Sequence, residues 1–149
     1  MNEARGLGVE QSAQQTDVAT YWGRPFATLF EQSSVAISLV SRDGIPLVVN
    51  SAFCRMLGRD AEDLIGLHFR AWTHPGDVDE CEALLSRLRT GQTVHETIET
   101  RYLHGDGGII WGLASIETLQ QEAVDALAPP SPACLICTIH DLSDRQHTL

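Results

Sequence analysis

The sequence has little positive charge and no long apolar run. It contains no lysine, and its 10 basic residues are outnumbered by 20 acidic ones, which gives a net charge of −10 at pH 7. Nucleic acids and anionic membranes attract positively charged proteins, so we expect neither as a partner. No stretch approaches the ~20 apolar residues of a transmembrane helix, and residues 1–17 lack the apolar core of a signal peptide. We therefore predict a cytoplasmic protein whose cysteines are reduced thiols.

Motifs of catalysis and metal binding are also missing. There is no Walker A or G-x-S-x-G motif, and "GDGGIIWG" lacks the third glycine of a dinucleotide fingerprint. Cys134 and Cys137 have metal-like C-x-x-C spacing. Their context has the pattern of a strand, where positions three apart face opposite ways. Glu96 and Glu99 fail as a carboxylate pair for the same reason, and we interpret them as solvated charges. We predict no metal site and no catalytic residue.

The hydrophobic pattern predicts one α+β domain. Residues 1–17 are polar and aperiodic, which is typical of a flexible tail, and helical spacing follows over 18–32. Two strands flank the "SRDG" turn, short helices follow at 51–57 and 61–65, and a longer helix lies within 74–91. Alternating segments at 93–104 and 109–119 are joined by "GDGG", and a last strand covers 133–141 after a Pro-rich loop. Strands grouped around a helical middle indicate an antiparallel sheet.

Four segments, in this order, resemble the signatures of PAS domains of the bacterial sensory S-box type. They are "FEQSSVAISLVSRDGIPLVVNSAFCRMLG", "THPGDVD", "RYLHGDGGIIW" and "HDLSDRQ". The resemblance implies a PAS domain over 33–142, with a five-stranded antiparallel sheet, helices on one face and the helical segment 18–32 on the other. It implies a sensory and dimerisation module that binds a small ligand, or relays partner contacts, and regulates a kinase, cyclase or phosphatase effector. The module itself is expected to be non-catalytic.

The segment "IIWGLASI" carries apolar residues on both faces of the strand that it predicts. In a sheet with one solvent-exposed face, apolar and polar residues would alternate along the strand. We therefore expect other segments to cover both faces of this strand. The resemblance places helices over Gly112 and Ala114. We expect the N-terminal segment, from the same chain or a second copy, to cover the other face in a homodimer interface formed by Trp22, Phe26, Phe30, Ile109, Trp111 and Leu113. The alternative is that Trp111 is half-exposed and packs only on sheet neighbours.

A ligand pocket is predicted over the inner face, because Gly112 and Ala114 are small. We expect its walls to be Asn50, Phe53, Met56, Leu57, Phe69, Trp72, Leu84, Leu88, Tyr102, Gly112 and Ala114. The alternative is that these side chains simply fill the space as core. Asn50 has a second interpretation as the N-cap of the helix 51–57. Tyr102 is the one titratable residue that we place inward, and on it rests the alternative function, a small catalytic domain acting on a small molecule.

The cofactor is unknown, but two candidates are not expected. Flavin photosensors among PAS domains carry a cysteine in a motif resembling Asn-Cys-Arg-Phe-Leu-Gln, and "HFRAWT" places Phe69 at that position. Haem-binding members use a histidine of the long helix, and "DVDECEALLSRLRT" contains none. Cys81 lies in the right region and a thiolate can bind haem iron, but we interpret Cys81 as a core residue. Neither a photoactive flavin nor haem is therefore expected.

The final segment "HDLSDRQHTL" is interpreted as the end of a strand and, from 143 to 149, the start of a connector. Asp141 falls where the strand ends, and its carboxylate can cap a following helix. In PAS domains the matching aspartate anchors the connector to the sheet, so we predict that Asp141 relays a signal to an effector. The alternative is a frayed polar C-terminus. The loop 120–132 is predicted to be exposed and to tolerate shortening.

Overall fold

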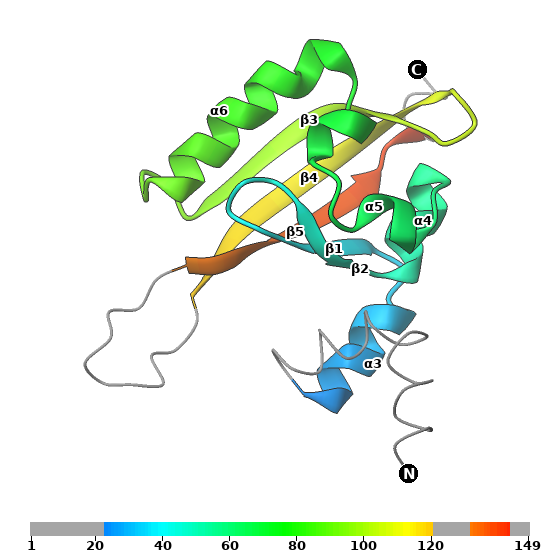
Figure 1. Cartoon of the computed structure of the whole chain (residues 1–149), viewed down its shortest axis with the longest axis horizontal. Helices are drawn as coiled ribbons and strands as arrows, with labels where there is room; N and C mark the ends of the chain where they lie inside the picture. The colour runs from blue at the N-terminus through cyan, green and yellow to red at the C-terminus, as the bar shows by residue number, and fades with distance from the viewer. Residues whose placement is uncertain (1–22, 121–131, 144–149) are drawn as a thin grey trace.

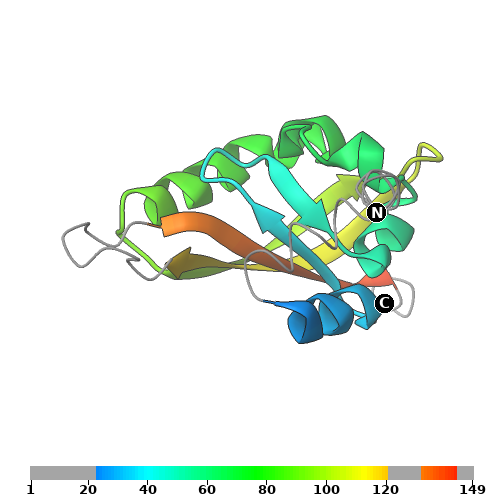
Figure 2. The same cartoon turned by 60° about the horizontal axis from the view of Figure 1, so that its bottom comes forward.

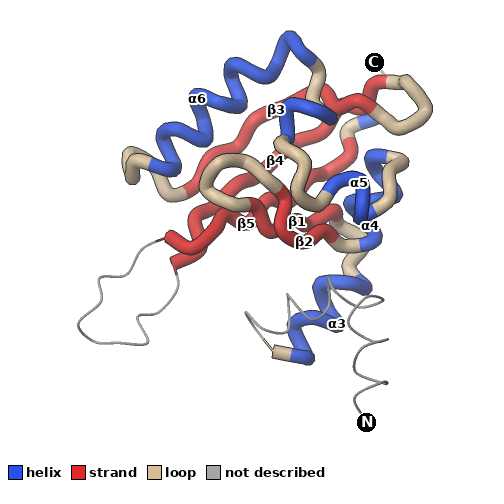
Figure 3. Tube along the Cα trace, viewed as in Figure 1, coloured by secondary structure: helices blue, strands red, loops and turns tan. Residues whose placement is uncertain are grey.

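The computed structural model describes residues 23–120 and 132–143. Predictions about the tail 1–17, about Trp22, about the loop 121–131 and about the connector beyond 143 lie outside the described residues. The elements (Figures 1 and 3) are α3 (Arg24–Gln32), β1 (Ala36–Val40), β2 (Pro46–Val49), α4 (Ser51–Leu57), α5 (Ala61–Leu64), η1 (Phe69–Trp72), η2 (Pro75–Asp77), α6 (Val78–Arg89), β3 (His95–Leu103), β4 (Ile109–Gln120) and β5 (Pro132–Asp141). None of the helices within the described ranges has the length and apolarity needed to cross a membrane.

The strands form one antiparallel sheet in the order β2-β1-β5-β4-β3. The last strand in the chain, β5, lies at the centre between β1 and β4. The helix α6 lies over one face of the sheet, and α3 lies on the opposite side (Figure 2). The predicted fold class, a five-stranded antiparallel sheet with helices on one face and an N-terminal helix on the other, is confirmed.

Local sequence signals explain where the short elements begin and end. The helix α4 has the predicted bounds, because the Asn50 side chain caps its first turn and Gly58, at φ 63°, ends it in a left-handed conformation. In the turn between β1 and β2, Gly44 has φ 92°, and a Cβ there would lie 2.8 Å from Phe69 Cδ1. Glycine is thus needed both for the turn and for its close packing. The η1 helix is not predicted, since four residues are too few to show a period.

Two hydrophobic cores lie on the two faces of the sheet. The larger core joins α4, α5, η1 and α6 to the inner face and includes Phe53, Leu57, Leu64, Trp72, Leu84, Leu88, Tyr102, Ala114, Leu135 and Ile139. The smaller core lies under α3 and contains Ala27, Phe30, Leu39, Val48 and Cys134. Cys134 belongs to the smaller core, whereas Cys137 packs against the larger one. The two thiols therefore face opposite ways, as predicted.

The described part of the N-terminal segment covers a different area from the predicted one. Pro25 lies in the first turn of a single helix, α3, which packs on β1, β2 and the start of β5 rather than over Trp111. Phe30 is buried in this contact within its own chain. Within one chain α3 therefore does not cover Trp111, because it packs on Leu39 and Val48 at the other end of the sheet. Cover of Trp111 by the N-terminal segment of a second copy stays a prediction. Trp111 instead packs beside Arg101, whose guanidinium carbon lies 5.5 Å from the ring centre.

Asn50 joins three elements through its fully buried side chain. Its Oδ1 accepts hydrogen bonds from the backbone N–H groups of Ile37 (3.0 Å) and Phe53 (2.9 Å). Its Nδ2 donates to the carbonyls of Phe30 and Val35, both at 2.9 Å. One amide thereby satisfies four backbone groups from the end of α3, the β1 strand and the start of α4. The capping interpretation of Asn50 is confirmed, and the amide has no free group to offer a ligand.

We expect Asn50→Ala to lower the free energy of unfolding by about 3 kcal/mol or more, because it leaves several buried backbone groups without hydrogen-bond partners. Urea denaturation monitored by circular dichroism measures this. Gln92→Ala is the matched control, since it removes an amide from an exposed turn and should change stability by under about 0.5 kcal/mol. A loss below about 1 kcal/mol for Asn50→Ala would mean that the surrounding backbone re-pairs without the amide.

Candidate functional site

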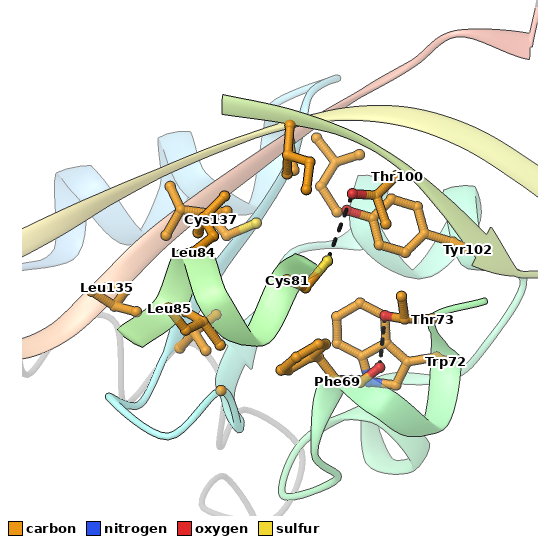
Figure 4. Close-up of a pocket in the computed structure, with 16 residues that line it drawn as sticks. Phe69, Trp72, Thr73, Cys81, Leu84, Leu85, Thr100, Tyr102, Leu135 and Cys137 are labelled. Carbon is orange, nitrogen blue, oxygen red and sulfur yellow. Dashed lines mark hydrogen bonds between the residues drawn. The ribbon is translucent and has the colours of Figure 1, made fainter. Parts of the chain in front are cut away.

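A cavity of about 60 Å³ lies between α6, η1 and the inner face of the sheet (Figure 4). Its lining residues come from every layer around it: Val40, Gly44, Phe69, Trp72, Thr73, Cys81, Leu84, Leu85, Ile98, Thr100, Tyr102, Ala114, Ile116, Leu135, Cys137 and Ile139. No side chain in this wall is ionised at neutral pH, because it consists of apolar groups, two threonines, two cysteines and one tyrosine. The cavity is therefore a small, uncharged, mostly apolar site.

Strand alternation supplies the floor of the cavity. The inward positions of β3 are Ile98, Thr100 and Tyr102, and the neighbouring strands β4 and β5 add Ala114, Ile116, Leu135, Cys137 and Ile139. Of these positions, the sequence predicts Tyr102 and Ala114 on the inner face. The helix α6 forms the opposite wall, and the turn at Gly44 closes one side against Phe69 and Leu85.

The structure brings only part of the predicted pocket together. Phe69, Trp72, Leu84, Tyr102 and Ala114 line the cavity. The other predicted wall residues, Asn50, Phe53, Met56, Leu57, Leu88 and Gly112, do not border it. Asn50 is occupied by backbone groups, and Phe53 packs edge-on against Trp72, with ring centres 5.7 Å apart. Four of the others, Phe53, Leu57, Leu88 and Met56, belong to or pack against the core instead.

The space above Gly112 is not open, which corrects the argument from its small size. A Cβ at this position would lie 2.7 Å from Ile139 Cγ2, 3.0 Å from Tyr102 Cε2 and 3.1 Å from Met56 Cε. Neighbouring side chains have therefore closed over the glycine. The cavity lies further along β4, above Ala114 and Ile116. Three lining residues were missed because they lie where a periodic pattern ends or is absent: Val40 at the end of β1, Gly44 in the following turn and Thr73 just after η1.

The hydroxyl groups of Thr100 and Tyr102 lie together in one corner of the cavity, where both residues project from β3 (Figure 4). Thr100 Oγ1 lies 3.8 Å from the Cys81 sulfur across the cavity wall. Burial raises the pKa of the Tyr102 hydroxyl well above its usual value, and a hydrogen bond to the Thr100 side chain offsets this only in part. Burial also raises the pKa of the Cys81 thiol, and that of Cys137 to about 12. All of these groups are neutral at pH 7.

Charged residues lie outside the cavity and hold α6 over β3 at both ends. At one end, the Arg101 guanidinium donates two hydrogen bonds to Asp77, at 2.8 and 3.0 Å. At the other, Arg87 donates two to Glu96, at 2.8 and 3.0 Å. Two-pronged pairs of this kind fix orientation as well as charge. Glu96 is thus not the solvated charge that its sequence position predicts, because the end of α6 brings Arg87 directly to it.

The described residues leave space for a few atoms in the cavity, and none of its lining side chains is charged at pH 7. Within the described ranges, no three His, Cys, Asp or Glu side chains are placed to share a metal ion. A strongly raised pKa makes Tyr102 a poor proton acceptor at pH 7. The fold and the cavity thus define a sensor-type α+β module, with a site enclosed between a sheet and the helices that cover it.

Comparison with known proteins agrees with this class. The PAS fold family matches residues 46–125, and the chain belongs to that family. A PAS domain from Colwellia psychrerythraea has a TM-score of 0.69 at 21% identity, over 82% of this chain and 98% of that one. The PAS domain, in complex with ethanol, of a LuxR-family transcriptional regulator from Burkholderia thailandensis has a TM-score of 0.59 at 22% identity, over 79% of this chain and 97% of that one.

Curated relatives are much longer signalling proteins. A probable diguanylate cyclase of Escherichia coli, DgcE, is 27% identical over 83% of this chain, which spans 11% of the relative. The sensor histidine kinase TmoS of Ectopseudomonas mendocina is 27% identical over 89% of the chain, which spans 13% of that protein. The chain thus spans about a tenth of these relatives. As a PAS domain with sensor proteins as homologues, it has a sensory role in signal transduction.

The pair between Arg87 and Glu96 should make stability depend on acid pH. Hydrogen bonds from Arg87 and Thr93 lower the pKa of Glu96 from 4.5 to about 2. A lowered pKa stabilises the fold fully above the ordinary value, and this contribution disappears as the pH falls through the folded value. The difference in unfolding free energy between wild type and Glu96→Gln should therefore be constant above pH 4.5 and shrink towards pH 2.

Urea denaturation across this pH range measures that difference. The matched control is Glu99→Gln, which removes one negative charge from the opposite face of the same strand. A difference that stays constant between pH 4.5 and pH 2 would show that the pair does not form in solution.

Proposed function

We propose that this chain is the sensory input module of a longer signalling protein. It binds a small ligand in the cavity beneath α6, pairs with a second copy through the outer face of the sheet, and passes its signal to an effector after β5. The single observation that carries the proposal is the cavity, because a core that only stabilised the fold would be filled to close packing. The ethanol complex of the Burkholderia relative supports a small ligand for this fold.

We further propose that the ligand is neither haem nor a photoactive flavin. Both groups are many times larger than a cavity of about 60 Å³. Phe69 forms part of the wall, and among the residues that line the cavity there is no histidine to bind iron. Cys81 borders the cavity, but its raised pKa opposes the thiolate that an iron ligand requires. A catalytic function is not favoured, since its sole candidate, Tyr102, stays protonated at pH 7.

The proposed dimer rests on apolar side chains on the outer face. Ile109 is 53% exposed, and Trp111 and Leu113 are half-buried on the same face. The described part of α3 leaves them uncovered, since α3 packs at the other end of the sheet. Contiguous exposed apolar groups on a stable domain mark an interaction surface. A second copy is the proposed partner, because an isologous contact places each patch against its own equivalent.

We expect wild type to be a dimer and Ile109→Lys to be a monomer, since the new charge would be buried without a partner at the interface. The exposed position of Ile109 lets the variant keep its fold. Native mass spectrometry reports both the oligomeric state and any retained ligand. Ala83→Lys on the exposed side of α6 is the matched control and should remain dimeric. A wild-type monomer at high concentration would contradict the proposed interface.

The proposed output path leaves the sheet beside the dimer face. The Leu142 N–H donates to the carbonyl of Trp111 at 2.8 Å, and Leu142 is buried. Asp141 Oδ1 accepts the Ser143 N–H at 2.8 Å. Asp141 thus holds Ser143, the first residue of the proposed connector, at the end of β5. A shift of β4 or β5 at the cavity would move the connector and, through it, an effector such as a kinase, cyclase or phosphatase.

We expect Asp141→Ala to change effector output when a histidine kinase is fused after Leu149. Loss of the bond to Ser143 frees the chain just after β5, so autophosphorylation should differ clearly from that of the unaltered fusion. Ser41→Ala is the matched control, because Ser41 also accepts a backbone N–H, from Asp43, in a turn beside the start of β5 rather than its end. Equal activity of the wild-type and Asp141→Ala fusions would mean that the signal leaves the domain elsewhere.

A further inference from the structure

We propose that the cavity selects small uncharged molecules with one oxygen atom, such as a short alcohol or ketone, and holds that oxygen at Thr100 and Tyr102. This inference rests on the proposed function, since it names the class of ligand for the same cavity. The inference depends on three features of the cavity: its size, the lack of charge in its wall and the position of the Thr100 and Tyr102 hydroxyl groups in one corner.

Size limits the ligand to a few atoms. The cavity measures about 60 Å³, and one water-sized sphere needs about 10–15 Å³ on this scale, so about four to six non-hydrogen atoms fit. Larger ligands would have to displace Phe69, Trp72 or Leu84, which are all buried core residues. The closely packed turn at Gly44 prevents enlargement on that side, because Phe69 and Leu85 already approach the glycine.

The wall excludes charged ligands. Arg70, Arg87 and Arg101 lie close to lining residues in the sequence, but their guanidinium groups are paired with Glu82, Glu96 and Asp77, none of which lines the cavity. An ionised carboxylate or ammonium entering the cavity would lose its water and find no opposite charge. The C4-dicarboxylate transport sensor of Rhodobacter capsulatus is 31% identical over 64% of this chain. A dicarboxylate is nevertheless a ligand class that this wall does not suit.

The hydroxyl groups of the polar corner have unused hydrogen-bonding positions that could bind one ligand oxygen atom. The hydroxyl groups of Thr100 and Tyr102 point toward each other and toward Cys81 (Figure 4). Thr100 is fully buried and Tyr102 is 5% exposed, so bulk water does not hydrogen-bond to their hydroxyl groups freely. Each hydroxyl offers one donor and two acceptor positions, and the contact of Thr100 Oγ1 with the Cys81 sulfur at 3.8 Å uses at most one of the two donors. A ligand oxygen at this corner can accept the remaining proton, and a ligand hydroxyl can also donate.

Thr73 does not belong to this corner, although its side chain also borders the cavity. Its Oγ1 donates to the carbonyl of Phe69 at 2.8 Å, so its proton is already used. The cavity thus contains one threonine whose donor is committed to the backbone and one whose hydroxyl faces the other polar groups. Thr100 and Tyr102 are therefore the hydroxyl groups that we expect to meet a ligand oxygen.

The test titrates four probes into the full chain: 1-propanol, propylammonium, propionate and xenon. Binding is measured from the shifts of the NMR resonances of the cavity residues. We expect 1-propanol to bind with a dissociation constant in the millimolar range, as ligands of so few atoms do, and the two ions to bind at least tenfold more weakly. Xenon should also bind, because it needs only apolar space. Ions that bind as tightly as 1-propanol would overturn the proposed selectivity.

Two variants then locate the oxygen. Tyr102→Phe and Thr100→Val should each weaken 1-propanol binding about fivefold, the effect of one neutral hydrogen bond, with xenon binding unchanged. The matched variant Thr97→Val, at an exposed position of β3 outside the cavity wall, should leave 1-propanol affinity unchanged. If xenon binds but both Tyr102→Phe and Thr100→Val retain wild-type affinity for 1-propanol, the polar corner is not the recognition site and this inference fails alone. If neither xenon nor 1-propanol shifts any cavity resonance, the proposed ligand site fails as well.

Discussion

The buried amide of Asn50 is the constraint on which the rest of the structure depends. Its four hydrogen bonds fix the end of α3, the first half of β1 and the start of α4 relative to one another. Glu31 reinforces the same junction, because its carboxylate accepts both the N–H and the hydroxyl proton of Ser51. A helix on the outer face of the sheet is thereby joined to a helix on the inner face. Any movement of one face at this junction is transmitted to the other through short, directional bonds.

The cavity persists because α6 is held beside the sheet rather than pressed fully onto it. The two arginine–carboxylate pairs, at opposite ends of α6, both attach to β3. Partly exposed pairs contribute little free energy, but their two-pronged geometry sets the height and angle of the helix. The side chains beneath α6 then leave a small gap instead of a fully interlocked core. These charged pairs therefore position α6 more than they stabilise the fold.

The sequence predicted more of the fold than of the residues that line the cavity. The expected inward positions of Tyr102 and Ala114 were correct, and the cap residues gave the bounds of α4, because strand alternation and capping are both local signals. The cavity wall depends on which side chains meet across elements, and periodicity does not encode that. Gly112 shows the difference, since Ile139, Tyr102 and Met56 fill the space that its missing side chain leaves. The partner of Glu96 was hidden in the same way, because Arg87 reaches it only after α6 has docked.

The central place of β5 has a consequence for how the chain is made. Ala36 pairs with Ile139, so the two halves of the sheet meet only through a strand near the end of the sequence. Before residues 132–141 leave the ribosome, β1 and β4 each present an unpaired edge, and such edges associate readily with other chains. Pairings so distant in sequence also form slowly, because closing a long loop costs entropy before any contact rewards it. A nascent chain that stalls before β5 is therefore the species of this protein most prone to aggregation.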